Sequence, residues 1–427
     1  MSTMRWVVDA IYLLTAVLTA PIWIVRLVST GKIRTDWAAR FGRLPISILQ
    51  REPRHPTVLI HTVSVGEVNL IRGFVEKLAE ADIAPRIVIA VTTDTGMARA
   101  HALYGDQFEV IRHPFDLSWA LRRVYRAINP SLLVLVELEI WPNESALCRD
   151  LGIPICVVNG RLSERSFRRY QRIRAVVSPM FQRLNLVLAQ TNAYADRFRA
   201  LGVANDRVRV CDTMKWDTAS LTVDSDTAEA LAAAMGLDRT RPIVVAGATA
   251  PGEHALLHRA VPEDVQLVCA PRKPEWFDEA AREMPGCVRR SAGERGRVGE
   301  RNRFLLDTIG ELRHAYSLAD IAVVGRTFEP FHGSDMMEPI ALGCPTIVGP
   351  STENFQEVVE ALLEGDGLVQ TTGEELPDVV RNLLNDPQRR DELVRNGQRV
   401  IRNRQGATAQ QAEAVLTLLR SSSPTTH

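Results

Sequence analysis

From residue 57 onward, short apolar runs alternate with longer amphipathic stretches such as "NLIRGFVEKLAE". The apolar runs are continuous in Val, Ile and Leu, which is typical of parallel strands buried on both faces. The strands expected in the first half of the chain are 57–62, 86–92, 108–112, 131–137, 154–159, 186–190 and 207–211. This alternation predicts a doubly wound α/β domain.

The polar stretch "WDTASLTVDSDT", 216–227, interrupts this pattern and is predicted to be a linker. The pattern then resumes with expected strands at 242–249, 265–272, 303–307, 320–325, 345–350 and 367–371. The predicted fold class is therefore α/β, with two doubly wound, Rossmann-like domains at 31–215 and 228–405. Ligands are expected at the carboxyl ends of the strands, in a cleft between the two domains.

Two further segments lie outside these regular patterns. The Gly/Arg/Glu-rich stretch 289–303 is expected to form a mobile surface loop. Residues 406–427 are expected to form a C-terminal helix, which is long enough to pack back on the N-terminal domain.

The N-terminus carries an uncharged apolar run, "AIYLLTAVLTAPIWIV" at 10–25. Its 16 residues are fewer than the ~20 that cross a bilayer comfortably. Residues 1–30 are predicted to form a membrane-anchoring helix that either spans the membrane or inserts deeply, and a buried core helix is the alternative. Because basic residues gather after the run from Arg26 onward, the rest of the chain is expected on the cytoplasmic side.

Charge and cysteine content narrow the possible functions. The chain has 51 basic and 51 acidic residues, so its composition gives no support for nucleic-acid binding. The basic stretches 26–54 and 161–174 are solvated faces or contact an anionic partner such as a lipid phosphate. The six cysteines form no CxxC pair and are expected to be reduced thiols. His254 and His258 form an HxxxH pair without further ligands nearby, so a zinc site is not expected.

Six segments, in this order along the chain, resemble motifs of the transferases that move 3-deoxy-D-manno-octulosonic acid (Kdo) from CMP-Kdo onto a lipid A precursor. They are "HTVSVGEVN" (61–69), "ELEIWPN" (137–143), "VNGRLSERS" (158–166), "DTMKWD" (212–217), "PRKPEWF" (271–277) and "LDTIGEL" (306–312). The resemblance implies a GT-B glycosyltransferase, with an acceptor-binding N-terminal domain and a nucleotide-sugar-binding C-terminal domain. It also implies chemistry without a metal ion or other cofactor.

The segment "GRTFEPFHGSDMMEP", 325–339, departs from this resemblance. The family usually has G-G-S here, followed by G-G-H-N-x-x-E. Arg326 and Thr327 replace the small residues, Ser334 and Asp335 stand at the His–Asn positions, and Glu338 matches. How the donor phosphate is held is therefore open.

Glu67 follows a glycine at an expected strand-to-helix turn, and two interpretations apply to it. An inverting glycosyl transfer needs one base to take the proton of the attacking hydroxyl, and the resemblance assigns this role to Glu67. A glutamate in the first turn of a helix also stabilises that helix by about 0.3–1 kcal/mol. Gly66 either lets the backbone approach a ligand or forms a tight turn, and amides near Ser64 are placed to hold an anion.

The other candidate residues follow expected strands or the domain junction. In the N-terminal domain, substrate contacts are predicted for Glu139, Arg161 and Lys215, with structural ion pairs or surface positions as the alternatives. In the C-terminal domain, the predicted nucleotide-binding residues are Gly252, Glu253, Arg272, Ser334, Glu338 and Asn354. The loop 247–254 is expected to cradle the phosphate, and the resemblance implies that Glu338 binds the ribose hydroxyls. The string "DSD", 224–226, is not interpreted as a metal site because it falls in the expected linker.

The predicted function is an inverting transfer of Kdo from CMP-Kdo to a lipid A precursor at the cytoplasmic face of the bacterial inner membrane. The expected partners are CMP-Kdo, the lipid acceptor and the membrane, and no nucleic acid. Another GT-B enzyme, such as a nucleotide-sugar epimerase or a transferase for a different sugar, is the alternative. A non-catalytic lipid-binding scaffold is a third interpretation.

Overall fold

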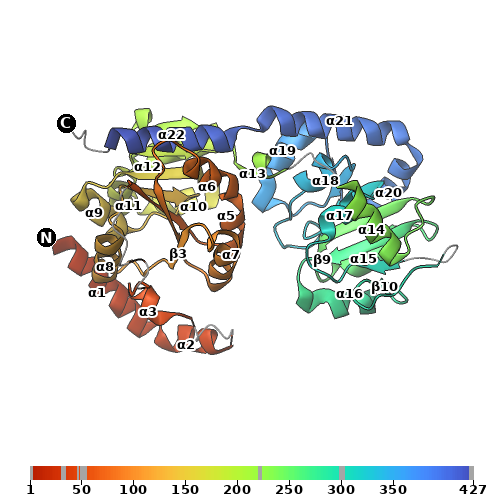
Figure 1. Ribbon diagram of the computed structural model, residues 1–427, viewed down its shortest axis with the longest axis horizontal. Coiled ribbons are helices and arrows are strands. Elements are labelled where there is room, and N and C mark those ends of the chain that lie inside the picture. The colour runs from red at the N-terminus through yellow and green to blue at the C-terminus, as the bar shows by residue number, and fades with distance from the viewer. Residues whose placement is uncertain are drawn as a thin grey trace. The chain divides into compact units, whose positions relative to one another are not determined.

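The computed structural model describes residues 3–29, 35–45, 48, 55–219, 224–297 and 303–422. The chain divides into two α/β units, which confirms the predicted fold class (Figure 1). Unit 1 comprises Met1–Thr218 with Gly406–His427, and unit 2 comprises Ala219–Gln405. Parts of five predicted segments lie outside the described residues: residues 1, 2 and 30 of the N-terminal helix, the basic residues Lys32, Arg34, Arg51 and Arg54, the centre of the linker (220–223), the end of the surface loop (298–302) and the end of the C-terminal helix (423–427).

Unit 1 is built on a seven-stranded parallel sheet with the order β3-β2-β1-β4-β5-β6-β7. Its strands are β1 (Thr57–Thr62), β2 (Arg86–Val91), β3 (Glu109–Arg112), β4 (Leu132–Val136), β5 (Ile155–Gly160), β6 (Leu186–Ala189) and β7 (Val208–Val210). Its helices from residue 37 onward are α3 (Trp37–Arg40), α5 (Val65–Leu70), α6 (Arg72–Ala79), α7 (Asp94–Tyr104), α8 (Ser118–Ile128), α9 (Pro142–Leu151), α10 (Glu164–Arg172), α11 (Arg174–Phe181), α12 (Asn192–Leu201), α13 (Lys215–Thr218) and α22 (Ala407–Ser422). Alternate residues of β1 enter different cores, Leu59 on one face and Val58 and Ile60 on the other. This two-sided burial explains why the strands are apolar throughout.

Unit 2 repeats the arrangement with a second parallel sheet of order β10-β11-β9-β8-β12-β13-β14. Its strands are β8 (Ile243–Thr249), β9 (Gln266–Pro271), β10 (Val288–Arg289), β11 (Arg303–Leu305), β12 (Ile321–Val324), β13 (Thr346–Val348) and β14 (Val369–Gln370). Its helices are α14 (Ser225–Met235), α15 (Glu253–Ala260), α16 (Phe277–Glu283), α17 (Leu312–Tyr316), α18 (Met337–Ala341), α19 (Gln356–Glu364), α20 (Leu376–Asn385) and α21 (Pro387–Arg404). Two short 3-10 helices, η3 (Pro274–Trp276) and η4 (Glu353–Phe355), lie in its loops.

The stretch expected as a mobile surface loop begins as ordered structure. Its first residue, Arg289, belongs to the edge strand β10 and forms ion pairs with Asp278 and Asp307. Asp307 also accepts hydrogen bonds from the backbone and hydroxyl of Ser291. Charge pairing with a neighbouring strand end therefore orders a segment whose composition is typical of a loop.

The ends of the predicted linker are helical. Residues 216–218 belong to α13 in unit 1, and residues 225–227 form the first turn of α14 in unit 2, where Asp224 caps the helix. The local capping of α14 by an Asp side chain explains why a polar stretch is helical here.

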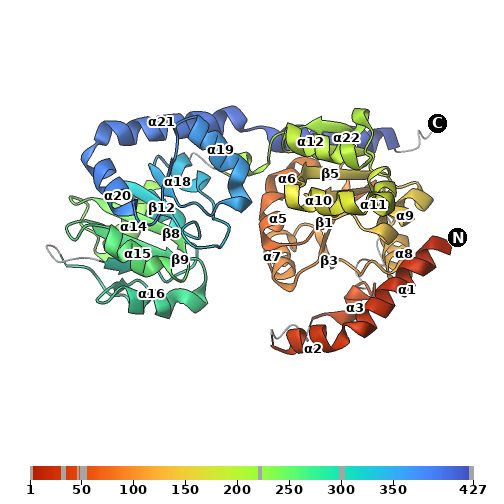
Figure 2. The ribbon, with the colours of Figure 1, turned by 180° about the vertical axis from the view of Figure 1, so that it is seen from behind.

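Helix α22 is the last element of the chain and packs in unit 1, against α6 (Figures 1 and 2). Val415, Leu416 and Leu419 enter the core on that face of the sheet. The buried side chain of Gln411 accepts a hydrogen bond from the backbone of Asn159 and donates two, to the carbonyls of Cys211 and Asp212. The end of the chain therefore completes the first domain.

The N-terminal segment forms two helices, α1 (Thr3–Leu18) and α2 (Ala20–Ser29), where a single helix was predicted. The two are bent by 67° at the break, and no single helix among the described residues is long and apolar enough to cross a membrane, although the bent pair is by length and composition. Buried Asp9 accepts hydrogen bonds from Ser118 and Asn143, and the Tyr12 hydroxyl donates to Asp116. These contacts attach one face of α1 to α8 and α9.

We predict that Gln411→Leu lowers the free energy of unfolding by about 2–4 kcal/mol, because three buried backbone groups lose their hydrogen-bond partner. Urea denaturation followed by circular dichroism measures the change. Gln410→Leu is the matched control, because Gln410 is the exposed neighbour on the same helix. A loss in the control as large as that in Gln411→Leu would contradict the assigned role of these hydrogen bonds.

Candidate functional site

In unit 1, the strand order reverses between β1 and β4, which lie side by side. Open α/β sheets bind ligands outside the carboxyl ends of the strands at such a switch point. The loop after β1 leads into α5, whose first turn carries Glu67, and the loop after β4 carries Glu137 and Glu139. Chain topology therefore places three carboxylates at the edge of the sheet where binding is expected.

Glu67 is held by the start of its own helix. Its carboxylate accepts hydrogen bonds from the backbone of Val63 (2.8 Å) and from the hydroxyl of Ser64 (2.9 Å), and Ser64 caps the helix by accepting from the Glu67 backbone. Burial raises the pKa of Glu67 to about 7, the charges of Glu137 and Glu139 act in the same direction, and the two hydrogen bonds oppose them. The result is a fixed, partly buried carboxylate that can accept a proton near neutral pH.

Glu139 and Arg161 occupy the neighbouring loops. Burial also raises the pKa of Glu139, whose carboxylate accepts a hydrogen bond from the indole of Trp141 (3.2 Å). Arg161 follows β5, and its backbone N–H donates to the carbonyl of Glu137, which has a positive φ of 61°. The structure thus places Glu67, in the first turn of α5, and Glu139 and Arg161, in the loops after β4 and β5, at one edge of the sheet.

Gly66 and Lys215, the two remaining candidates of unit 1, lie in helices α5 and α13. Gly66 is exposed in the first turn of α5 and has no positive φ, so its backbone conformation does not by itself require glycine. Lys215 begins α13, beyond β7, and its backbone N–H donates to the hydroxyl of Thr213. The two residues before Lys215 lie at the end of β5, because the Thr213 hydroxyl and the Met214 backbone N–H both donate to the side chain of Asn159, two residues before Arg161.

A buried cluster that the sequence did not indicate lies at the same edge of the sheet. The rings of His61 and His113 stack at 3.5 Å, His113 Nε2 lies 2.9 Å from Glu144 Oε1, and the Tyr125 hydroxyl donates to the same oxygen. His61 Nε2 lies 3.0 Å from the hydroxyl of Thr92. Burial and His113 hold the pKa of His61 well below its usual value, so its ring is neutral. Only the position of His61 at a strand end could have drawn attention to this cluster.

His61, His113 and Glu144 are the one group in the described part of the chain whose ligand atoms lie close enough to hold a metal ion. The ring planes are 3° from parallel. Imidazole lone pairs lie in the ring plane, so two stacked rings do not direct their lone pairs at one point. The arrangement matches a hydrogen-bonded cluster that joins β1, β3 and α9.

The start of α9 is tied to the N-terminal helix. Asp116 accepts hydrogen bonds from the backbone N–H groups of Asn143 and Glu144, and the Asn143 amide donates to Asp9 and to the Asp116 carbonyl. Asn143 belongs to the "ELEIWPN" motif and is almost completely buried. Its role in this structure is to connect α1, α8 and α9.

In unit 2, the strand order reverses between β8 and β12. Glu253, the first residue of α15, is completely buried there and accepts four backbone hydrogen bonds, from Ala250, Arg326, Thr327 and Phe328. The prediction that Glu253 contacts the nucleotide therefore needs correction. Its carboxylate joins the loop after β8 to the loop after β12, because buried charge requires several donors.

Gly252 has a positive φ of 88°, which favours glycine. A Cβ at this position would lie 3.1 Å from the carboxylate of Glu329. The loop expected to cradle a phosphate thus has a carboxylate against it, and an anion at Gly252 would be repelled.

The remaining predicted residues of unit 2 lie in loops around this switch point. Arg272 follows β9 with an exposed side chain, and Asn354 lies in η4 with its backbone N–H bonded to the carbonyl of His332. The buried hydroxyl of Ser334 has no hydrogen-bond partner among the described residues. Glu338 Oε1 lies 3.5 Å from Arg313 Nη1, and burial, followed by Asp335, raises the pKa of Glu338. A buried, unpartnered hydroxyl and a carboxylate with a raised pKa are features of a polar ligand site.

Comparison with known proteins identifies the family. Residues 35–218 match the family described as "3-Deoxy-D-manno-octulosonic-acid transferase (kdotransferase)", and residues 298–400 match "Glycosyl transferases group 1". The 3-deoxy-D-manno-octulosonic acid transferase of Haemophilus influenzae is 31% identical over 82% of this chain and 84% of its own length. The transferase of the same name from Bordetella pertussis is 31% identical over 88% of this chain and 90% of its own.

The fold has solved counterparts at lower identity. The crystal structure of Anabaena Alr3699/HepE in complex with UDP is 16% identical, with a TM-score of 0.59, over 84% of this chain and 99% of that one. This likeness shows the two-unit fold alone. The family match and the two curated relatives lead to one conclusion: the chain belongs to the 3-deoxy-D-manno-octulosonic acid transferase family.

Proposed function

We propose that this protein is an inverting glycosyltransferase that moves Kdo from CMP-Kdo to a lipid A precursor in lipopolysaccharide biosynthesis. Membership of the family and the names of its relatives support the reaction class. The observation that carries the mechanism is Glu67, a carboxylate fixed at the β1/β4 switch point with a pKa of about 7.

The proposed reaction needs one base. A hydroxyl of the acceptor attacks the anomeric carbon of Kdo, its oxygen forms the new glycosidic bond, and the bond from that carbon to the phosphate oxygen breaks. The hydroxyl proton passes to the Glu67 carboxylate, and CMP leaves with the bonding electron pair. The hydrogen bonds from Val63 and Ser64 keep the carboxylate in one orientation, which limits the reorganisation required during attack.

Unit 2 is proposed to bind the donor. Glu338 is placed in the first turn of α18 to accept hydrogen bonds from the ribose hydroxyls, and Ser334 has a buried hydroxyl available to the nucleotide. Arg272 supplies a positive charge for the phosphate at the end of β9. The backbone N–H of Asn354 donates to the carbonyl of His332. Because His332 is two residues before Ser334 in the chain, this bond keeps the segment of Asn354 close to that of Ser334.

We further propose that α1 and α2 hold the enzyme on the cytoplasmic face of the inner membrane without a straight span. Leu14, Leu18 and Ile22 are 61%, 71% and 74% exposed, and the opposite face of α1 is attached to unit 1 through Asp9. An amphipathic helix of this kind inserts its apolar face at the lipid interface.

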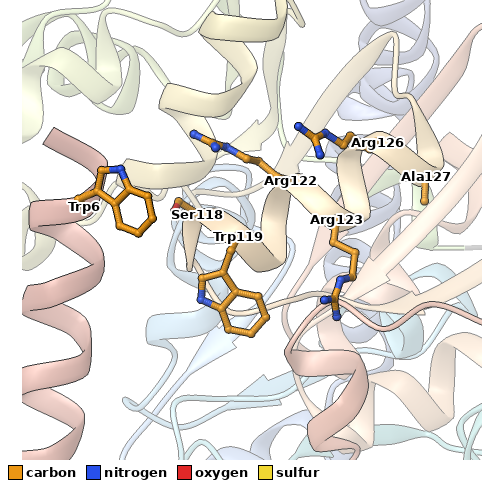
Figure 3. A pocket seen from close by; sticks show the side chains of 7 residues that line it. All are labelled: Trp6, Ser118, Trp119, Arg122, Arg123, Arg126 and Ala127. Atoms are coloured by element: carbon orange, nitrogen blue, oxygen red, sulfur yellow. The ribbon is translucent and has the colours of Figure 1, made fainter. Parts of the chain in front are cut away.

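A groove beside α1 supports this placement. Figure 3 shows Trp6 of α1 beside Ser118, Trp119 and three arginines of α8, which line a cavity of about 550 Å³. Those arginines are Arg122, Arg123 and Arg126. Tryptophan is favoured at the membrane interface and arginine is attracted to anionic headgroups. The arginines of α10, at 165, 168, 169 and 172, line a second basic cavity of about 440 Å³ that suits the phosphates of an acceptor.

The reaction is tested with purified protein, CMP-Kdo generated in situ and a defined lipid A precursor, with mass spectrometry of the lipid. A mass increase of one or more Kdo residues is expected. If no Kdo–lipid forms where a known relative produces it, the proposed function is wrong.

Glu67→Gln is expected to lower kcat by about 10²–10⁴-fold, because the amide cannot accept the hydroxyl proton. Gln retains an oxygen for the hydrogen bond from Val63 and is accepted in capping boxes, so the helix start should remain. Steady-state kinetics together with thermal unfolding measure the two effects separately. Glu80→Gln, at an exposed position that ends α6, is the control. Near-normal turnover in Glu67→Gln would remove this residue as the base.

The pH dependence follows from the raised pKa of Glu67. The ionised carboxylate is the active form, so kcat/KM should rise tenfold per pH unit below about pH 7 and level off above it. The residual activity of Glu67→Gln should lack this rise. A wild-type profile that is already level from pH 5 would show that the active base has an ordinary carboxylate pKa.

Membrane binding should depend on the exposed face of α1. Leu14→Glu combined with Leu18→Glu is expected to weaken partitioning into anionic vesicles by about 100-fold, because two buried leucine contacts with lipid are lost. Flotation with vesicles measures the bound fraction, and Leu151→Glu, on an exposed position of α9, is the control. Unchanged flotation of the double variant would contradict the proposed placement.

A further inference from the structure

The loop after β12 cannot hold a phosphate with its backbone. In doubly wound domains the amides at a switch point commonly bind phosphate. Here the amides of Arg326, Thr327 and Phe328 all donate to Glu253, at 2.7–3.0 Å. Glu329 lies against Gly252 in the neighbouring loop. A negatively charged donor must therefore be bound by side chains in this region.

Arg326 is the residue best placed to do so. It has a positive φ of 60°, a conformation that costs an arginine on the order of 1 kcal/mol or more and that glycine adopts freely. Its Nη2 donates to the carbonyl of Phe331 (2.8 Å), whereas its buried Nε has no hydrogen-bond partner among the described residues. A strained backbone and an unused buried donor both indicate that the side chain serves a purpose other than folding.

Arg272 lies on the other side of the same short backbone segment. Its backbone N–H donates to the carbonyl of Thr249 (2.9 Å), and Gly325 packs so closely on Thr249 that an added Cβ would lie 2.4 Å from its Cα. Arg272 and Arg326 therefore flank Thr249 at the β8/β12 switch point. Burial lowers the pKa of Arg326, and the charge of Arg272 acts in the same direction.

Two neighbouring cations need anions. Glu253 compensates for part of this charge, but its carboxylate oxygens are engaged by backbone N–H groups. CMP-Kdo carries one negative charge on its phosphodiester and a second on the carboxylate of the sugar acid. The number of charges on this donor therefore equals the number of guanidinium groups carried by Arg272 and Arg326, whose backbone segments lie against Thr249.

We propose that Arg326 and Arg272 form a paired anion site that binds the phosphodiester and the sugar carboxylate of the donor, in place of the loop amides. This rests on the proposed function for the identity of the donor. Arg326 is thus a donor-binding residue that distinguishes an acidic sugar nucleotide from a neutral one. Ser334 is held close to it, because the backbone of Gly333 donates to the Arg326 carbonyl (2.8 Å).

The test uses Arg326→Gly, since glycine removes the side chain and relieves the positive φ, so the variant should fold at least as well as the wild type. Loss of a charge-assisted hydrogen bond should raise KM for CMP-Kdo about 10–100-fold, with kcat changed less than threefold. Arg326→Lys, which keeps the charge, should recover part of this loss. Arg395→Ala removes one exposed positive charge from α21 and should leave KM unchanged.

Binding of CMP by the full chain, measured by calorimetry, separates this inference from the proposed function. A weaker CMP affinity in Arg326→Gly supports the anion site even if the wild type forms no Kdo–lipid. Wild-type KM and CMP affinity in Arg326→Gly, in a protein that does form Kdo–lipid, would overturn it. A wild type that binds UDP at least tenfold more tightly than CMP, with this preference lost in Arg326→Gly, would assign the pair to a diphosphate and overturn the carboxylate contact.

Discussion

In each unit a buried carboxylate holds separate segments together near the carboxyl edge of the sheet: Glu253 in unit 2 and Glu144 in unit 1. Glu253 accepts four backbone hydrogen bonds from the loops after β8 and β12. The carboxylate of Glu144 accepts a hydrogen bond from the Tyr125 hydroxyl and lies within hydrogen-bond distance of His113 Nε2, so it links α9 to the residue that follows β3. An isolated buried carboxylate would cost several kcal/mol, so each is stable only while its donors are in place. In unit 2, the two loops at the switch point are therefore held in one arrangement by Glu253.

Glu67 shows how one side chain serves both structure and chemistry. Its hydrogen bonds with Ser64 and Val63 are those of a helix start, and on their own they would lower its pKa. Burial and the charges of Glu137 and Glu139 outweigh them and bring the pKa to about 7. The structural and the catalytic interpretations of this residue are thus compatible, because the hydrogen bonds that orient the carboxylate lower its pKa by less than burial and the neighbouring charges raise it.

The N-terminal helix illustrates a similar division between two faces. Asp9 immediately precedes the apolar run 10–25 in the sequence, and a charge at this position is typical of the boundary of a membrane segment. In the structure Asp9 is buried and bonded to Ser118 and Asn143, while the leucines on the other face are exposed. Asn143 also bonds to Asp116, in the loop before α8. The same group of hydrogen bonds therefore attaches α1 and fixes the start of α9.

The sequence by itself determined the two parallel sheets, since strands buried on both faces must be continuously apolar, and it drew attention to Glu67, Arg272 and Glu338 at strand ends and helix starts. It also carried the family resemblance. Only the tertiary structure decided that α1 and α2 are separate helices and that Gln411 bonds α22 to the rest of unit 1. It also decided that Glu253 is buried with four backbone hydrogen bonds, and that the segments of Arg272 and Arg326 both lie against Thr249. The physical reason is the distance along the chain between the residues that interact. Periodicity and capping depend on residues a few positions apart, whereas burial, hydrogen-bond partners and pKa depend on segments that the fold brings together from distant parts of the chain.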